Sequence, residues 1–303
     1  MSKQQIKLLN SVTDIYKGKS RPVKEDVGFI VHDFNEVTLQ YPYTSGVYRT
    51  NYYSFLFIKD GSGSYTLDDA TFHFSANCFY FSNPGHIKSH YFEQLREAYR
   101  IAVTEEFIVK YIHPDIFNEF PFLIAETSVP QALDADDVAV FENIFKQIQR
   151  EFNSSAPSSY RITGKYFAIL LYKIKDKFWA NYLPLEEGDR SSQIVRNFKK
   201  NMELHFSAIS KGAVERIFTV ADFAELQNLN ANYFNQVIKS KTGRTVTEWL
   251  NNKMLVAAQG LLLHSPRSIK EIAFLLGFSD GAHFSKFFKK HTLSSPLQYR
   301  KAR

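Results

Sequence analysis

Residues 28–110 alternate between apolar and polar positions in short runs, as strands do when one side of a sheet covers a core. Runs of this kind fill 52–58, 64–67, 71–74, 78–81 and 99–103. Turn-forming residues separate them, with Lys-Asp-Gly-Ser-Gly at 59–63, Asp-Asp at 68–69 and Asn-Pro-Gly at 83–85. Short strands at even spacing with such turns predict a small β-barrel or sandwich.

The apolar period changes to that of a helix after Asp134. A helix over about 134–152 is predicted, with Phe141, Phe145, Ile148 and Phe152 on one face. A second helix over about 160–182 carries its own stripe: Ile162, Tyr166, Leu170, Ile174 and Phe178. Apolar stripes must be covered, so these helices pack on the β domain, form a dimer seam, or do both.

A polar stretch, Pro184–Asp189, marks the expected linker, and the sequence after it is helical to its end. We therefore predict an α+β fold class with two domains. Residues 1–184 form the β-barrel or sandwich with its two following helices, and residues 185–303 form an all-α domain. The length of 303 residues fits two domains at ~100–200 residues each.

The all-α part contains an internal repeat. Residues 220–229 match 269–278 at a constant offset of 49, and residues 234–239 match 284–289 at an offset of 50. Trp249 matches Tyr299 at the second offset. A long helix over 246–264, largely apolar, is expected to join the two copies and to fix them relative to each other.

Each copy fits a helix-turn-helix unit. A small residue, Ala224 or Ala273, lets the second helix cross closely over the first, and Leu229 or Phe278 fills the corner between them. Gly277 gives the second turn its backbone freedom. We expect Asn230 and Ser279 to be the N-caps of the second helices. Two helix-turn-helix subdomains joined by a long helix follow from this pattern.

The second helix of each copy buries one face and presents a polar one. Asparagine and glutamine can make paired hydrogen bonds to an adenine edge in the major groove, and lysine can reach guanine or phosphate. The candidate DNA-binding residues are Asn230, Asn232, Asn235, Gln236, Lys239, Lys241 and Arg244 in the first copy. In the second copy they are Ser279, Asp280, His283, Ser285, Lys286 and Lys289.

The charge of the chain is divided between its two parts. Residues 190–303 hold 18 Lys and Arg against 7 Asp and Glu, a charge of +11. The rest of the chain holds the remaining 19 Lys and Arg against 24 Asp and Glu, a charge of −5. A basic module joined to an acidic one is typical of a polyanion-binding domain attached to a domain of another kind. The repeat and its charge together favour double-stranded DNA as the partner.

Residues 190–303 resemble the AraC/XylS family of bacterial transcription regulators. The strings that carry the resemblance are Ser-Ile-Lys-Glu-Ile-Ala at 268–273, Gly-Phe at 277–278, His-Phe-Ser-Lys-Phe-Phe-Lys-Lys at 283–290, Pro296 and Tyr-Arg at 299–300, with Lys-Thr-Gly at 241–243 and Glu-Trp at 248–249. The family usually has glycine where Leu293 stands, so we expect that turn to be built differently here. The resemblance implies a cytoplasmic regulator, a homodimer as a rule, and contact with RNA polymerase if it activates transcription.

The N-terminal part resembles, more loosely, the cupin-like sensor domains of that family. This resemblance is carried by three segments: Tyr-Tyr at 52–53, Gly-Ser-Gly at 61–63, and the stretch 79–86, which ends in Asn-Pro-Gly-His. It implies a barrel that binds a small-molecule effector. Alternate strand positions and polar strand ends give the candidate effector-binding residues: Arg49, Tyr53, Phe55, Tyr65, Phe81 and His86.

An alternative is a metal-dependent cupin enzyme with a helical appendage, and a third reading is a protein-interaction scaffold. A cupin metal site needs clustered histidines and a carboxylate. His86 and His90 echo half of such a motif, but Arg49, Thr50 and Asn51 stand where its other half is expected. We therefore predict no metal, no other cofactor and no catalytic residues.

The single cysteine, Cys78, excludes a disulfide within the chain and is expected in the core. The sequence shows neither a signal peptide nor an apolar run of membrane-spanning length, so we expect a cytoplasmic protein without a membrane partner.

Overall fold

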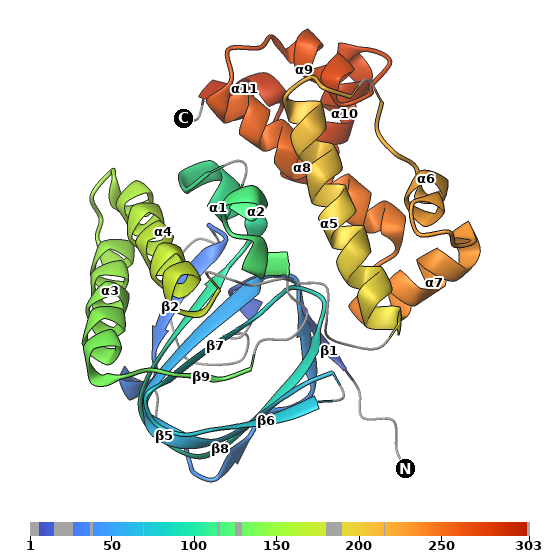
Figure 1. The fold of residues 1–303 in the computed structure, drawn as a ribbon. Helices are drawn as coiled ribbons and strands as arrows, with labels where there is room; N and C mark the ends of the chain where they lie inside the picture. Colours follow the sequence, from blue (N-terminus) through green and yellow to red (C-terminus); the bar gives the residue numbers. More distant parts are fainter. Residues whose placement is uncertain are drawn as a thin grey trace. The chain divides into compact units, whose positions relative to one another are not determined.

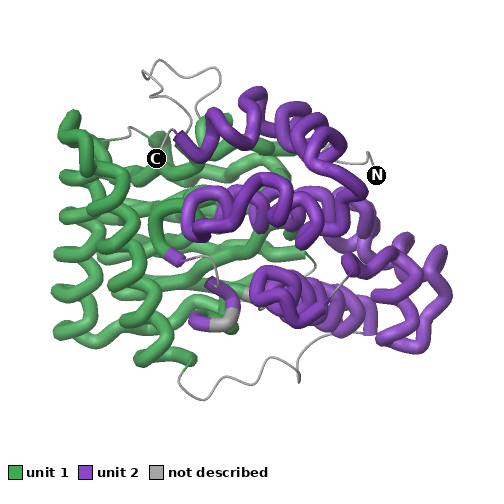
Figure 2. Tube along the Cα trace, turned by 90° about the horizontal axis from the view of Figure 1, so that it is seen from above, with its two compact units in different colours: residues 1–112, 120–183 green, residues 113–119, 184–303 purple. Residues whose placement is uncertain are grey.

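A computed structural model describes residues 6–14, 27–36, 39–68, 70–113, 116–124, 129–179, 190–214 and 216–301. The chain forms two compact units, one with residues 1–112 and 120–183 and the other with residues 113–119 and 184–303 (Figure 2). The expected linker at 184–189 and the end of the second predicted helix lie outside the described residues.

One curled sheet forms the centre of the first unit (Figure 1). Its strands within the described residues are β1 (Lys7–Leu9), β2 (Phe29–Asp33), β3 (Tyr43–Thr44), β4 (Tyr48–Thr50), β5 (Tyr53–Leu67), β6 (Ala70–Phe74), β7 (Cys78–Ser82), β8 (Ile87–Val103) and β9 (Gln131–Ala132). The strand order is β1-β4-β8-β5-β7-β9, while β2 and β3 also pair with β8 and β6 pairs with β5. The two long strands, β5 and β8, are antiparallel and hold this sheet together.

The glycines at 61 and 63 lie inside β5, so the prediction of a turn at 59–63 is wrong. The register of β5 against β8 shifts in this segment, so the strand bulges instead of reversing. A Cβ on Gly61 would lie 2.8 Å from a methyl carbon of Leu95, and one on Gly63 would lie 2.1 Å from the carbonyl oxygen of Tyr91. Glycine is needed here because the two strands approach closely. The next predicted turn is confirmed, since β5 and β6 form a hairpin with Asp68 at φ 53°.

The two faces of the sheet hold different cores. Phe55, Phe57, Phe79 and Phe81 point to the helical side, where Phe55 contacts Phe167 with ring centroids 5.1 Å apart. The inner face holds a second buried cluster: Leu56, Ile58, Tyr65, Leu67, Phe74, Cys78, Tyr80, Phe92, Leu95 and Ala98. Cys78 is buried as expected, and burial raises the pKa of its thiol to about 12.

Two long helices, α3 (Ala135–Asn153) and α4 (Ser159–Phe178), lie side by side against the sheet (Figure 1). The predicted face of α3 is buried, and Asp134 caps the helix by accepting a hydrogen bond from the backbone N–H of Asp137. The buried face of α4 differs from the predicted stripe. It contains Phe167, Leu170, Leu171 and Ile174, whereas Ile162 is 38% exposed.

Short helices α1 (Glu105–Tyr111) and α2 (Ile116–Glu119) follow β8. The second unit contains α2 together with α5 (Arg190–Ser210), α6 (Val220–Glu225), α7 (Ala231–Thr242), α8 (Val246–His264), α9 (Ile269–Leu275), α10 (Gly281–Thr292) and α11 (Pro296–Lys301). The α+β fold class is therefore confirmed, and α8 has the predicted bounds. Within the described residues, no helix combines the length and the apolar character needed to cross a membrane.

Candidate nucleic-acid interface

Two helix-turn-helix modules form the second unit, α6 with α7 and α9 with α10. The small residues expected at the crossings, Ala224 and Ala273, are 1% and 0% exposed. The turns match each other in detail. The N–H of Leu229 donates to the carbonyl of Ala224 at 3.0 Å, and that of Phe278 donates to Ala273 at 2.9 Å. The internal repeat of the sequence is thus a repeat of backbone hydrogen bonds.

Each turn contains one residue in the left-handed region. In the second module it is Gly277, at φ 73°, as the sequence indicates. In the first module Asn228 takes the same place at φ 54°. Asparagine tolerates this conformation better than other residues with a side chain, because its short amide hydrogen-bonds locally.

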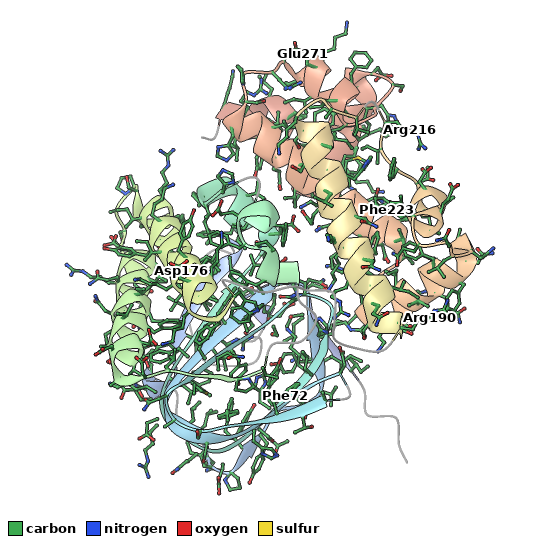
Figure 3. All side chains as sticks on the ribbon, in the orientation of Figure 1. Phe72, Asp176, Arg190, Arg216, Phe223 and Glu271 are labelled. Atoms are coloured by element: carbon green, nitrogen blue, oxygen red, sulfur yellow. The ribbon has the colours of Figure 1, made fainter. Side chains whose placement is uncertain are left out.

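A reciprocal capping box begins α6, α8 and α9. Thr219 pairs with Asp222, Thr245 with Glu248, and Ser268 with Glu271, which is labelled in Figure 3. Hydrogen bonds from Thr245 lower the pKa of Glu248, and those from Ser268 lower the pKa of Glu271. Each box satisfies backbone N–H groups that would otherwise lack partners at a helix start.

A bidentate pair joins Arg216 to Asp222, with both distances at 2.7 Å. This pair is the first cause of the lowered pKa of Asp222. The loop before α6 is therefore fixed onto the first module.

The long helix α8 couples the two modules into one body. The first core includes Phe198, Phe223, Phe234 and Trp249, and the second includes Ile272, Phe284 and Phe288 (Phe223 is labelled in Figure 3). Ile217, Met254 and Ala257 pack against both cores. Relative motion of the modules would therefore have to break apolar contacts that they share.

The outer face of α7 presents mostly neutral polar side chains and one lysine. Asn230, Asn232, Gln236 and Lys239 are exposed, as expected of groups that contact DNA. Asn235 is only half-buried, and its Oδ1 accepts a hydrogen bond from the backbone N–H of Val246 at 2.9 Å. The side-chain oxygen of Asn235 is therefore engaged in holding the start of α8.

The outer face of α10 is basic. Lys286 and Lys289 are exposed together with His283, while Ser285 is half-buried. The predicted N-cap, Ser279, is wrong by one residue. Asp280 caps the helix, because its side chain accepts a hydrogen bond from the N–H of His283 at 2.7 Å. The second turn is one residue longer than the first, so Asp280, and not Ser279, corresponds to Asn230.

One exposed residue on these faces was missed from the sequence. Tyr233 is 45% exposed on α7. The repeat itself carries the signal for it, since the offset of 50 aligns Tyr233 with His283. Lys290, which the sequence places on the polar face of the second helix, is exposed beside Lys289 on α10.

Lys241 and Arg244, at the end of α7, are half-buried. The guanidinium of Arg244 lies 5.6 Å from the ring centre of Trp249. A stacked guanidinium of this kind is held in place and keeps its N–H groups at the edge of the module.

The turn after α10 is built in the same way as the turn after α7, contrary to our expectation. Gly243 ends α7 at φ 77°, and Leu293 ends α10 at φ 62°. Their N–H groups donate to the carbonyls of Lys239 and Lys289 at 2.8 and 2.9 Å. The leucine is thus forced into a conformation that favours glycine.

The candidate effector-binding residues do not lie on one face of the N-terminal sheet. Phe55 and Phe81 contact the rings of the helical side, whereas Tyr65 belongs to the inner cluster. Tyr53 is buried at the start of β5, two residues before Phe55. Arg49 is half-buried in β4, and burial lowers the pKa of its guanidinium. No single surface therefore contains the whole predicted set.

His86 is buried and does not meet a second histidine. Its Nδ1 lies 2.6 Å from a carboxylate oxygen of Asp68, whose other oxygen accepts from the N–H of Ile87. The Nδ1 of His90, on β8, lies 3.0 Å from the hydroxyl of Tyr48. Among the residues that the structure describes, no group of three His, Cys, Asp or Glu side chains is placed to hold a metal ion.

Comparison with known families gives a match over the C-terminal region. Residues 223–302 match the family described as helix-turn-helix domain. This range covers the second helix of each module, α7 and α10, and the whole of α8.

Curated relatives match over the same region. The transcriptional activator RhaR of Salmonella schwarzengrund is 33% identical over 88 residues, which are 29% of this chain and 31% of that protein. The transcriptional activator RhaS of Escherichia coli is 38% identical over 80 residues, which are 26% of this chain and 29% of that protein. The matched region thus spans about a third of the length of these relatives.

Among solved structures, apo ToxT from Vibrio cholerae aligns with 90% of this chain and 97% of its own, at 16% identity and a TM-score of 0.39.

Proposed function

We propose that this chain, whose residues 223–302 belong to the helix-turn-helix domain family, is a sequence-specific DNA-binding regulator of transcription. Over these residues the resemblance to the AraC/XylS family is confirmed. The relatives matched here are named as transcriptional activators, which supports the same class of activity for this chain.

One observation carries the proposal: two equivalent modules share core residues through α8 while each leaves the polar face of its second helix exposed. Fixed modules can offer two helices to successive major grooves, ~34 Å apart on one face of the duplex. If the two modules were loosely linked, fixing their relative orientation on DNA would cost entropy and weaken binding.

The second helices of the two modules, α7 and α10, are the proposed recognition helices, and they suit different contacts with DNA. Asn232 and Gln236 on α7 offer amides, which pair with adenine edges and carry sequence information. Lys286, Lys289 and Lys290 on α10 offer charge, which suits phosphates and contributes to every sequence alike. We propose that α7 supplies more of the specificity and α10 more of the salt-dependent affinity. Asp280 contributes by starting α10 and not by touching phosphate, because two anions repel.

The test begins with selection of bound fragments from random double-stranded DNA, followed by titration of the enriched site. Gln236→Ala should cost about 1–3 kcal/mol on that site and reduce discrimination at one base pair. Asn235→Ala, one residue away, is the matched control. It should lower the stability of the protein but leave discrimination in place, because its amide oxygen binds Val246.

Lys289→Ala should weaken binding to all sequences and reduce the slope of log affinity against log salt by about 1. Absence of salt-dependent binding to any DNA would refute the proposal and favour a protein-interaction scaffold.

We further propose that residues 1–184 form a sensor or dimerisation domain and that residues 185–303 form the DNA-binding domain. Control by a small-molecule effector, a homodimer, contact with RNA polymerase if the protein activates, and a location in the cytoplasm belong to the same proposal. The exposed apolar side chains of Ile162, Ile169 and Tyr172 on α4 support a dimer seam beside the packing already made by that helix.

The geometry disfavours the alternative of a metal-dependent enzyme. Lys88 of β8 lies between His86 and His90 in the sequence, is 1% exposed, and donates to Thr50 Oγ1 and Ser82 Oγ at 2.8 Å each. A buried ammonium group beside the histidines opposes a divalent cation. Stoichiometric iron, manganese or zinc in the purified protein would revive that alternative.

A further inference from the structure

Three polar aromatic side chains from different strands stack on the inner face of the N-terminal sheet. Tyr65 of β5, Tyr80 of β7 and His90 of β8 are 1%, 1% and 8% exposed. Their ring centres are 4.7 Å apart for the two tyrosines, 5.5 Å for Tyr65 and His90, and 6.3 Å for Tyr80 and His90. We call these three residues the inner triad.

Each member of the inner triad buries a polar atom that the fold does not pair. Tyr65 Oη, Tyr80 Oη and His90 Nε2 have no hydrogen-bond partner among the described residues. Burial without a partner costs stability, and phenylalanine would fill the same space without that cost. The positions therefore keep polar atoms that packing alone does not explain.

The inner triad is arranged to donate hydrogen bonds. Burial, together with the nearby positive charges of Arg100 and Lys88, lowers the pKa of His90 to about 3, so the ring is neutral. Tyr48 Oη lies 3.0 Å from His90 Nδ1. When Tyr48 donates to Nδ1, the neutral ring carries its proton on Nε2. Two hydroxyls and one ring N–H can then act together as donors.

The surroundings favour an acceptor that carries negative charge. Arg100, whose Nε donates to Ser54 Oγ at 3.0 Å, acts electrostatically on Tyr48, Tyr80 and His90. The carboxylate that acts on Tyr65 is Asp68, and both its oxygens are bonded, one to His86 and one to the N–H of Ile87. An oxyanion would thus meet donors and positive charge on this face.

We propose that the inner face of the sheet binds a small carboxylate with an aromatic body, whose oxygens accept hydrogen bonds from Tyr65, Tyr80 and His90. Phe74 and Phe92 border the triad, with ring centres 5.8 Å from Tyr80 and 5.5 Å from His90, and supply the aromatic surroundings. As the effector site of a regulator, this inference rests on the proposed function, but the binding itself does not.

Calorimetric titration of the full-length protein with phenylacetate, and with its neutral analogue phenylacetamide, tests the proposal. Phenylacetate should bind at least about tenfold more tightly, because hydrogen bonds to a charged group are the stronger ones. Tyr65→Phe and Tyr80→Phe should each weaken phenylacetate at least about tenfold. Equal affinity for the two compounds, no binding of phenylacetate, or unchanged affinity in both variants overturns the site.

Tyr99→Phe is the matched control. Tyr99 is 2% exposed on the same strand as His90, but its ring contacts Phe57 and Phe145 on the helical side. This variant should bind phenylacetate like the unchanged protein, and an equal loss of binding there would show that the effect is not local and would overturn the assignment.

Melting without ligand gives a second readout. Tyr80→Phe should melt at the same or a higher temperature, since it removes an unpaired buried hydroxyl. A melting temperature several degrees lower would mean that the hydroxyl is bonded by buried water, which overturns the inference. Operator titration separates the two proposals: phenylacetate binding without any DNA binding sinks only the proposed function, and DNA binding without phenylacetate binding sinks only the inner site.

Discussion

Replacing Leu293 by glycine should stabilise the C-terminal unit, although it removes a large side chain. Leu293 ends α10 at φ 62°, and its side chain is 89% exposed, so almost no buried surface is lost. The left-handed region costs a residue with a Cβ about 1–2 kcal/mol of folding free energy. Glycine avoids this cost but destabilises the folded state by about 0.5–1 kcal/mol, because its unfolded chain has more conformational freedom to lose. The net gain in the free energy of unfolding is about 0.5–1 kcal/mol.

Urea denaturation followed by tryptophan fluorescence measures this gain. The chain has two tryptophans, Trp179 and Trp249, so a Trp179→Phe background makes the signal report the C-terminal unit. Leu293→Ala separates the two contributions, because alanine removes the exposed side chain but keeps the strained φ, and it should give no gain. Gly243→Leu, at the equivalent turn, should destabilise.

A Leu293→Gly variant that unfolds at the same or a lower urea concentration would refute the reasoning. It would mean that the leucine is held by contacts strong enough to offset its backbone conformation. A gain in Leu293→Ala equal to that of Leu293→Gly would assign the effect to the exposed side chain.

Other changes test the remaining features of the fold. Thr242→Val should cost about 1–3 kcal/mol, because the indole N–H of Trp249, now 2.9 Å from the Thr242 hydroxyl, loses its buried acceptor; urea denaturation in the same background measures it. Thr245→Ala should cost about 1 kcal/mol by the same assay, because it breaks the capping box of α8. The pKa of His90 is lowered to about 3 in the folded protein. As the pH drops below about 6.5, His90 is therefore protonated in the unfolded chain but stays neutral in the folded one, and the free energy of unfolding falls. Between pH 7.5 and 5 this residue should cost about 2 kcal/mol, and a His90→Gln variant with an equally steep loss would show that other groups are responsible.

Helical periodicity predicted the C-terminal unit well, because in a long amphipathic helix many apolar positions repeat the same period and indicate the same buried face. The bounds of α8 follow from its apolar run, and the two modules follow from the repeat. Single positions at turns were harder. Ser279 and Asp280 are both good N-caps by residue type, and only the backbone path decides that Asp280 bonds to the N–H of His283.

The β unit shows what local patterns do not determine. Glycines at 61 and 63 are as typical of a bulge as of a hairpin, and the choice depends on β8, a partner strand distant in sequence. The same applies to the inner triad. Tyr65, Tyr80 and His90 come together through the registers of three strands, and a shift by one residue would turn any of them to the helical side.

The duplicated module separates what the fold requires from what the surface does. Both copies keep a small residue at the crossing, a left-handed residue in the turn and an acceptor side chain at the cap, although the residues differ, as Asn228 and Gly277 do. These positions satisfy the backbone. The exposed positions do not serve the backbone in this way. Lys239 aligns with Lys289 and is unchanged, whereas Gln236 aligns with Lys286. Because the scaffold needs neither amide nor ammonium there, this difference is best explained by what each helix meets outside the protein.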